Sequence, residues 1–153
     1  MKTSAGLLLF RRRADAIEVL LVHPGGPLFA KKDSGAWSIP KGEIEPGEEL
    51  LARAKREFEE ETGIAPRGEF FEIGSVKQKG GKVVHAWAFE GDVGENFRFR
   101  SNTFEMEWPS RSGRVQSFPE VDRAEFFPLE TARGKINPAQ AEFLDRLAAA
   151  VRA

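Results

Sequence analysis

Three glutamates stand close together near the middle of the sequence, at Glu57, Glu60 and Glu61. If this segment is helical, positions three and four apart are neighbours, so the carboxylates gather within about a third of the helix circumference. Glu61 then projects into the sector that holds Ala54 and Phe58, at the margin of the buried stripe. Carboxylates there repel one another and are costly to bury without a positive charge. Their oxygen atoms suit Mg²⁺ or Mn²⁺.

A plainer interpretation of the same run is a solvated acidic face. Arg56 and Glu60 are four residues apart and can form an ion pair on the helix surface. Charge runs on helices are commonly exposed to water. That interpretation leaves Glu57 and Glu61 without partners, whereas a divalent cation would neutralise all of these carboxylates.

The residues around the glutamates resemble the Nudix box, whose pattern is G-x5-E-x7-R-E-U-x-E-E-x-G-U with U an apolar residue. Every specified position of the pattern is met. The matching residues are Gly42, Glu48, Arg56, Glu57, Phe58, Glu60, Glu61, Gly63 and Ile64. The resemblance implies an α/β (α+β) fold, a Nudix-type α/β/α sandwich around a mixed β-sheet, with residues 1–153 as a single Nudix hydrolase domain.

The resemblance also implies a role for each position of the box. The family hydrolyses a phosphoanhydride bond in a nucleoside diphosphate linked to another moiety, with Mg²⁺ as cofactor and Mn²⁺ as an alternative. Phosphoryl transfer needs charge neutralisation and positioning more than covalent help, which suits these residues. The implied catalytic residues are Glu57, Glu60, Glu61 and Arg56, and the implied metal ligands are Glu57, Glu60, Glu61 and the Gly42 carbonyl. Glu48 would pair with Arg56 to fix the loop on the helix.

A further acidic metal ligand is expected from a downstream loop, because families of this type often recruit one. Glu120, which precedes the last predicted strand, is the best candidate. Its rivals are Asp122, Glu105 and Glu107, and a plain surface role for Glu120 is an equal alternative.

The segment before the box resembles the W-x-x-P-K-G-x4-G-E pattern shared by dinucleoside polyphosphate and diphosphoinositol polyphosphate hydrolases. Lys41 would be a point charge for a long phosphate chain, with an exposed loop lysine as the alternative. Trp37 is expected to bind substrate by stacking on a base, with core packing as the alternative. Other aromatic candidates for stacking are Trp87, Phe104 and Trp108.

We therefore expect hydrolysis of a dinucleoside polyphosphate or a similar polyphosphorylated nucleotide. Housecleaning pyrophosphohydrolysis of nucleoside triphosphates is one alternative. Another alternative is a catalytically silent Nudix domain that binds a nucleotide or a partner. The complete set of clustered carboxylates argues against it, because a silent domain would be free to lose them. Hydrolysis at an RNA 5′ end would need a basic groove that the near-neutral composition does not predict. A monomer and a homodimer both stay open.

The composition excludes several other kinds of site. The 153 residues are 41% hydrophobic and 31% charged, as in one globular domain. The absence of cysteine excludes disulfides, thiolate zinc sites and cysteine nucleophiles, and two histidines exclude a His-rich metal centre. A net charge of −1 indicates no bulk basic field. The short apolar run before Arg11 is neither a signal peptide nor a membrane span, so we expect a cytoplasmic protein with no membrane partner.

The elements that must position the box can be predicted coarsely. A helix is expected over residues 48–62, ended by Gly63 as C-cap. Before it, residues 37–49 are expected to form an ordered loop, and Arg11–Arg13 the turn of a hairpin. Strands are expected over 5–10, 17–22, 69–76, 82–91 and 124–129.

Two regions outside these elements carry different signals. Residues 91–118 show no clear periodicity. The C-terminal segment predicts an amphipathic helix with Asn137 as N-cap, Pro138 in the first turn and Gln140 placed for a capping box. His23 falls in a loop and His85 in a strand, and both are expected to be structural.

Overall fold

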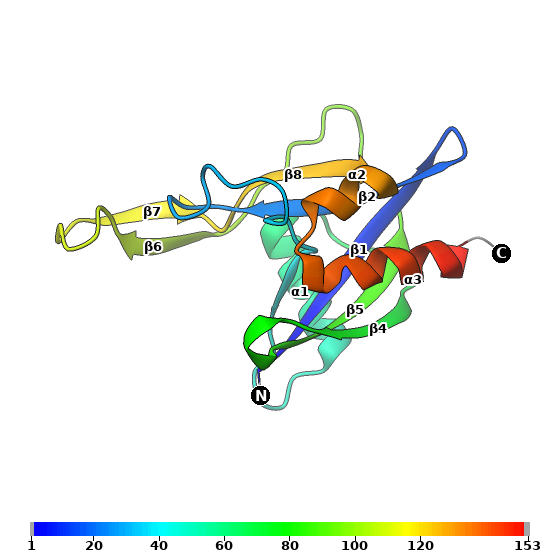
Figure 1. The fold of residues 1–153 in the computed structure, drawn as a ribbon, viewed down its shortest axis with the longest axis horizontal. Coiled ribbons are helices and arrows are strands. Elements are labelled where there is room, and N and C mark those ends of the chain that lie inside the picture. The colour runs from blue at the N-terminus through cyan, green and yellow to red at the C-terminus, as the bar shows by residue number, and fades with distance from the viewer. Residues whose placement is uncertain (1, 152–153) are drawn as a thin grey trace.

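The computed structural model describes residues 2–151, in which a mixed β-sheet carries helices on both faces (Figure 1). The strands are β1 (Thr3–Arg13), β2 (Ala16–Pro24), β3 (Lys41–Glu43), β4 (Phe71–Lys77), β5 (Val83–Glu90), β6 (Thr103–Glu107), β7 (Val115–Pro119) and β8 (Val121–Pro128). The helices are α1 (Leu50–Thr62), α2 (Leu129–Lys135) and α3 (Ala141–Val151), with 3₁₀ turns at Lys79–Gly81 and Pro138–Gln140. Within residues 2–151, no helix has the length and apolar character that crossing a bilayer requires.

The main sheet has the strand order β4-β5-β1-β2-β8, and β3 pairs with the start of β1. β1 and β5 run parallel, whereas the other neighbouring strands run antiparallel. The two-stranded sheet of β6 and β7 projects away from the main sheet as an arm (Figure 1).

Apolar residues fill both faces of the central strands, so the sheet needs cover on both sides. In β1, Leu7 belongs to the cluster that includes Phe58 of α1, and the next residue, Leu8, to the cluster that includes Phe143 of α3. Successive side chains of a strand point to opposite faces, so α1 lies on one face and α3 on the other. The predicted α/β/α sandwich around a mixed sheet is confirmed.

The helix α1 forms where the periodicity predicted it, and its apolar stripe packs on the sheet. Ala54 and Phe58 are fully buried, and Leu50 and Leu51 are partly buried against the same cluster. The helix ends at Gly63, whose φ of 80° is left-handed and whose N–H donates to the Glu59 carbonyl. Glycine adopts this conformation without strain, so the predicted C-cap is confirmed.

The expected loop and turn boundaries before α1 were wrong in two places. Arg11–Arg13 extend β1 instead of forming a turn, and the chain reverses at Ala14 and Asp15, both with positive φ. Arg11 is held in the strand by ion pairs with Glu18 at 2.8 Å and Asp92 at 2.9 Å. The expected loop over 37–49 contains β3, because its backbone pairs with the edge of β1.

The C-terminal cap was predicted in part. The Asn137 side chain accepts a hydrogen bond from the Ala139 N–H at 2.9 Å, as expected of an N-cap. Gln140, however, takes no part in a capping box. It is fully buried, and its side-chain oxygen accepts from the Ile39 N–H at 3.0 Å while its nitrogen donates to Gln78 at 2.9 Å. Gln140 thus anchors the segment that enters the Gly42–Ile64 motif.

Candidate active site

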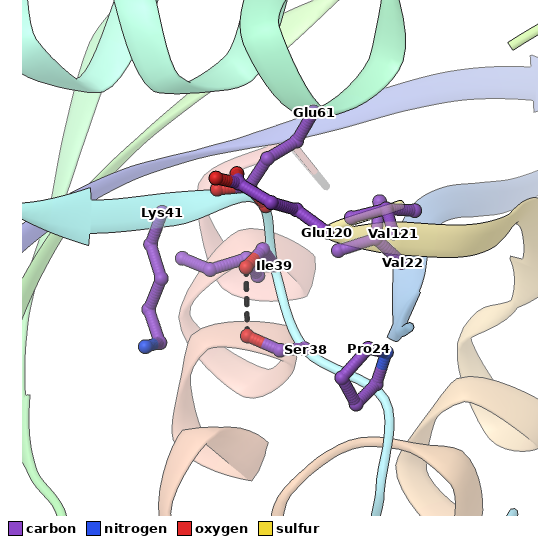
Figure 2. A pocket seen from close by; sticks show the side chains of 8 residues that line it. All are labelled: Val22, Pro24, Ser38, Ile39, Lys41, Glu61, Glu120 and Val121. Carbon is purple, nitrogen blue, oxygen red and sulfur yellow. Dashed lines mark hydrogen bonds between the residues drawn. The ribbon is translucent and has the colours of Figure 1, made fainter. Parts of the chain in front are cut away.

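Residues from four parts of the chain line a cavity of about 270 Å³ beside the C-terminal half of α1. Glu61 reaches it from α1, Lys41 from β3 and Glu120 from the residue before β8 (Figure 2). Val22 and Ser38 line the same space. The fold therefore brings together three predicted site residues that are far apart in the sequence.

The box glutamates differ sharply in exposure. Glu57 and Glu61 are only 8% and 9% exposed, whereas Glu60 is half-buried. Burial raises the pKa of Glu61 well above its usual range, and the charges of Glu57 and Glu120 raise it further. The Lys41 ammonium and a hydrogen bond from the Lys41 backbone lower that pKa in part. The acidic cluster is thus buried at an electrostatic cost, as the helical spacing predicted.

Glu120 shares the electrostatic environment of the box although it lies 59 positions beyond Glu61 in the sequence. Glu120 is exposed and lines the cavity, and partial desolvation and then the charge of Glu60 raise the pKa of its carboxylate. Glu120 also raises the pKa values of Glu57 and Glu61. Glu120 thus lies near enough to the box carboxylates for their charges to interact.

The rival acidic residues are engaged elsewhere. Asp122 Oδ1 lies 2.7 Å from His23 Nδ1. Glu105 and Glu107 are on the projecting β6 strand, and the Glu107 carboxylate accepts hydrogen bonds from the Arg111 and Gly113 N–H groups at 3.0 Å. The structure therefore favours Glu120 as the additional acid.

Gly42 lies directly against the acidic cluster. A Cβ atom at this position would lie 2.2 Å from Glu57 Cδ, a distance at which atoms clash. Only glycine lets the β3 backbone approach the Glu57 carboxylate this closely. The Gly42 carbonyl is thus on the part of the chain that contacts the predicted ligands.

Arg53 is a site residue that the sequence analysis missed. Its Nη2 lies 2.6 Å from Glu57 Oε1, and its Nη1 lies 3.4 Å from Glu48 Oε1. The Arg53 side chain is only 12% exposed, and its buried Nε has no hydrogen-bond partner among residues 2–151. The i, i+4 spacing of Arg53 and Glu57 was the available signal.

Arg56 makes both of the ion pairs considered from the sequence. Its Nη1 lies 3.5 Å from Glu48 Oε2, and its Nε lies 3.6 Å from Glu60 Oε2. Arg56 itself is exposed, so each pair is worth little in stability, about 0–1 kcal/mol. The pair with Glu48 links the loop before α1 to the helix surface.

The donor set fits a divalent cation. It consists of carboxylate oxygens, two of them buried with raised pKa values, beside a glycine whose backbone lies against them. Within residues 2–151, no three acidic or histidine side chains are gathered tightly enough to form a ready-made ion cage. Glu57 is instead paired with Arg53.

The two predicted substrate-binding residues have different surroundings. Lys41 lines the cavity half-buried, and burial lowers the pKa of its ammonium while Glu61 opposes that shift. Trp37 is 1% exposed, donates its Nε1–H to Asp33 at 2.8 Å and meets Phe127 edge to face. A buried ring offers no face to a base, so the core alternative holds for Trp37.

The sequence and fold match known proteins. A family model described as "NUDIX domain" matches residues 1–147. An RNA pyrophosphohydrolase from Novosphingobium aromaticivorans is 44% identical over 54 residues, which cover 32% of this chain and 34% of that protein. An asymmetrical bis(5′-nucleosyl)-tetraphosphatase from Sus scrofa is 42% identical over 67 residues, covering 40% of this chain and 42% of that protein. Each match thus spans less than half of the relative's length.

A solved structure of a Caenorhabditis elegans Ap4A hydrolase in a binary complex superposes with a TM-score of 0.68. The superposition covers 99% of this chain and 98% of that chain at 22% sequence identity, which shows a shared fold. The family model covers nearly the whole chain and includes the complete motif from Gly42 to Ile64. This chain belongs to the Nudix family.

Proposed function

We propose that this chain is a pyrophosphohydrolase that cleaves a phosphoanhydride bond in a nucleoside diphosphate linked to another moiety, with a dinucleoside polyphosphate or similar polyphosphorylated nucleotide as substrate. The observation that carries the proposal is the cavity that Lys41 lines together with the acidic pair of Glu61 and Glu120. A cation and two carboxylates around one space suit a phosphate chain that is bound together with a divalent ion.

The residues that would hold Mg²⁺ or Mn²⁺ are Glu57, Glu60, Glu61, Glu120 and the Gly42 carbonyl. When bound, the ion supplies positive charge that neutralises the diphosphate oxygens. The raised pKa values of Glu57 and Glu61 support this assignment, because the buried charges are poorly compensated by the protein alone.

The chain's own residues orient the substrate and move the proton. The water oxygen attacks one phosphorus, the phosphoanhydride P–O bond breaks, and the leaving phosphate takes its electron pair. The proton of the water passes to a carboxylate of the cluster, for which Glu61 is suited because burial raises its pKa well above its usual range. Arg53 and Arg56 hold Glu57 and Glu60 in place during the reaction.

Lys41 supports a substrate with a long phosphate chain. Lys41 belongs to β3, the strand next to the acidic cluster, and it lines the cavity. A lysine at this place can bind the oxygens of phosphate groups that lie beyond the cleaved phosphoanhydride bond. The relative named bis(5′-nucleosyl)-tetraphosphatase is consistent with such a substrate.

Product analysis with Mg²⁺ tests the proposal. Diadenosine tetraphosphate, nucleoside triphosphates, ADP-ribose and a 5′-triphosphorylated RNA are compared, with Glu61→Gln as the inactive control. ATP and AMP from the dinucleotide, lost in the control, are the expected result. An RNA substrate is included because one group of relatives is named RNA pyrophosphohydrolase.

Other outcomes would change the proposal. Pyrophosphate released from a triphosphate would make the chain a housecleaning enzyme, and cleavage of RNA alone would move it to 5′-end processing. If wild type and control are equally inert while a nucleotide binds, the chain is a silent binding domain.

A further inference from the structure

His23 is fully buried, and both of its ring nitrogens face oxygen atoms. Nδ1 lies 2.7 Å from Asp122 Oδ1, and Nε2 lies 2.6 Å from the Lys32 carbonyl oxygen. A carbonyl oxygen only accepts, so Nε2 must carry a hydrogen. A neutral imidazole has a single N–H, so the contact between Nδ1 and Asp122 needs a second hydrogen, on the ring or on the carboxyl group. Both hydrogen bonds together hold the ring in one orientation.

The ring lies directly behind the wall of the proposed active site. Val22 and Pro24, the neighbours of His23 in β2, line the cavity, and so do Val121 at the start of β8 and Glu120 just before it. His23 therefore ties the end of β2 to the start of β8 from the side away from the cavity.

Asp122 is the extra residue of a bulge between these strands. His23 pairs with Arg123 and Pro24 with Val121, so β8 has one more residue than β2 at this place. A bulge bends its strand and changes the direction of nearby side chains. The hydrogen bond from His23 thus holds Asp122, the bulge residue at which β8 bends, two positions after Glu120.

The backbone on the other side of Glu120 is also closely packed. The Gly25 N–H donates to the Glu120 carbonyl at 2.9 Å, and a Cβ at Gly25 would lie 1.9 Å from the Pro119 oxygen. The segment that carries Glu120 is therefore fixed against the end of β2 at two points, Gly25 and His23.

We propose that His23 is a positioning residue, which acts with Asp122 to lock the β8 bulge and so directs the Glu120 carboxylate towards the acidic cluster. Through Lys32 it also ties down the loop that follows β2. The proposal rests on the proposed function, in which Glu120 helps to hold the divalent ion.

Three variants and a matched control test the hydrogen bonds. His23→Phe keeps a ring but loses both bonds, and Asp122→Leu removes the partner at similar volume. Asp122→Asn keeps both bonds, because its amide can donate to Nδ1 while Nε2 keeps its hydrogen for Lys32. His85→Gln removes the second of the chain's two histidines and serves as the control.

With diadenosine tetraphosphate, His23→Phe and Asp122→Leu should lower kcat about 10–100-fold with little change in KM, whereas Asp122→Asn and His85→Gln should stay near wild type. A merely structural role would lower the melting temperature but leave kcat of the folded protein unchanged. Wild-type kcat in folded His23→Phe, or an Asp122→Asn variant as impaired as Asp122→Leu, would overturn the proposal.

Two readouts do not depend on the substrate. The Mn²⁺ affinity, measured by titration calorimetry, should fall about tenfold in His23→Phe and Asp122→Leu and stay unchanged in Asp122→Asn. An unchanged affinity in the first two would overturn the proposal even if wild type cleaves none of the nucleotides. In the His85→Gln protein, NMR should show a His23 Nε2–H protected from exchange, and the absence of this signal would refute the Lys32 contact.

Discussion

At the scale of single residues, Glu61 is the proposed proton acceptor, and its surroundings disfavour its negative charge. It is 9% exposed, and burial, Glu57 and Glu120 all disfavour its charge. A residue that the fold accommodates this poorly is a candidate for function, because perturbed carboxylates cluster at active sites. The spacing of Glu61 from Glu57 could be predicted from the sequence. The hydrogen bond that Glu61 accepts from the Lys41 backbone could be found only from the structure.

Replacing Glu61 by Gln should separate activity from stability. The amide keeps the shape but loses the charge that holds the ion and accepts the proton, so kcat should fall by at least about 100-fold. The free energy of unfolding at neutral pH without metal should be unchanged or higher, because a buried charge is removed. Glu59→Gln, on the exposed side of α1, is the matched control and should change neither quantity. A Glu61→Gln protein with wild-type turnover would exclude Glu61 from the chemistry.

Arg53 should matter more for stability than Arg56 does. Its pair with Glu57 joins side chains that are 12% and 10% exposed, and removing one partner of a buried pair costs about 3 kcal/mol. We expect Arg53→Met to lower the free energy of unfolding by about this amount in chemical denaturation. Mn²⁺ should then raise the melting temperature more in Arg53→Met than in wild type, because Glu57 has lost its internal counter-charge. Arg67→Met, in an exposed loop, is the control. Equal stability of both variants would show that Arg53 contributes no net energy.

At the scale of elements, the sequence predicted the helices and strands that are marked by a residue pattern within one short stretch of chain. The helix α1 follows from apolar spacing and a terminal glycine within one stretch of chain. The strand β3 is only three residues long and exists because it pairs with Thr3–Gly6 of β1, a partner that no local pattern indicates. The arm of β6 and β7 has mostly exposed side chains, so it lacks the buried alternation by which strands are found. The hydrogen bond between His23 and Asp122 joins residues 99 positions apart, so no local sequence pattern indicates it either.

The arm should be removable without loss of the fold. Its two chain ends are adjacent, since the Glu120 N–H donates to the Asn102 carbonyl at 2.8 Å. Its aromatic residues Phe104 and Phe118 pack against each other at 6.0 Å, outside the two core clusters. Replacing residues 103–118 by a short glycine linker should therefore shift the melting temperature by only a few degrees, about what a change of 1 kcal/mol produces. Loss of the cooperative transition in calorimetry would show instead that the arm is part of the folded core.

At the scale of the whole molecule, a chain with a net charge of −1 concentrates several carboxylates at one place. Burial is the first cause of the raised pKa values of Glu57, Glu61 and Glu120. The folded state therefore binds these protons more tightly than the unfolded state, in which the pKa of glutamate is about 4.3. Between that value and the raised ones, the folded state holds more protons, so this contribution to stability falls as the pH rises. A divalent cation would bind the ionised carboxylates of the folded state. Its contribution to stability would therefore rise with the pH, opposite to the contribution of the protons.

We therefore expect the pH dependence of stability to change sign with the cation. Without metal, the melting temperature of wild type should fall relative to Glu61→Gln as the pH rises above the range where ordinary glutamates titrate. With Mg²⁺ in excess, wild type should gain stability over the same range, by about 2.7 kcal/mol at a concentration 100 times the dissociation constant. Thermal melts of both proteins at a series of pH values, with Mg²⁺ or with a chelator, measure this difference. If the two proteins run parallel at every pH and Mg²⁺ stabilises both equally, the cation binds elsewhere, and the acidic cluster is a structural feature of α1.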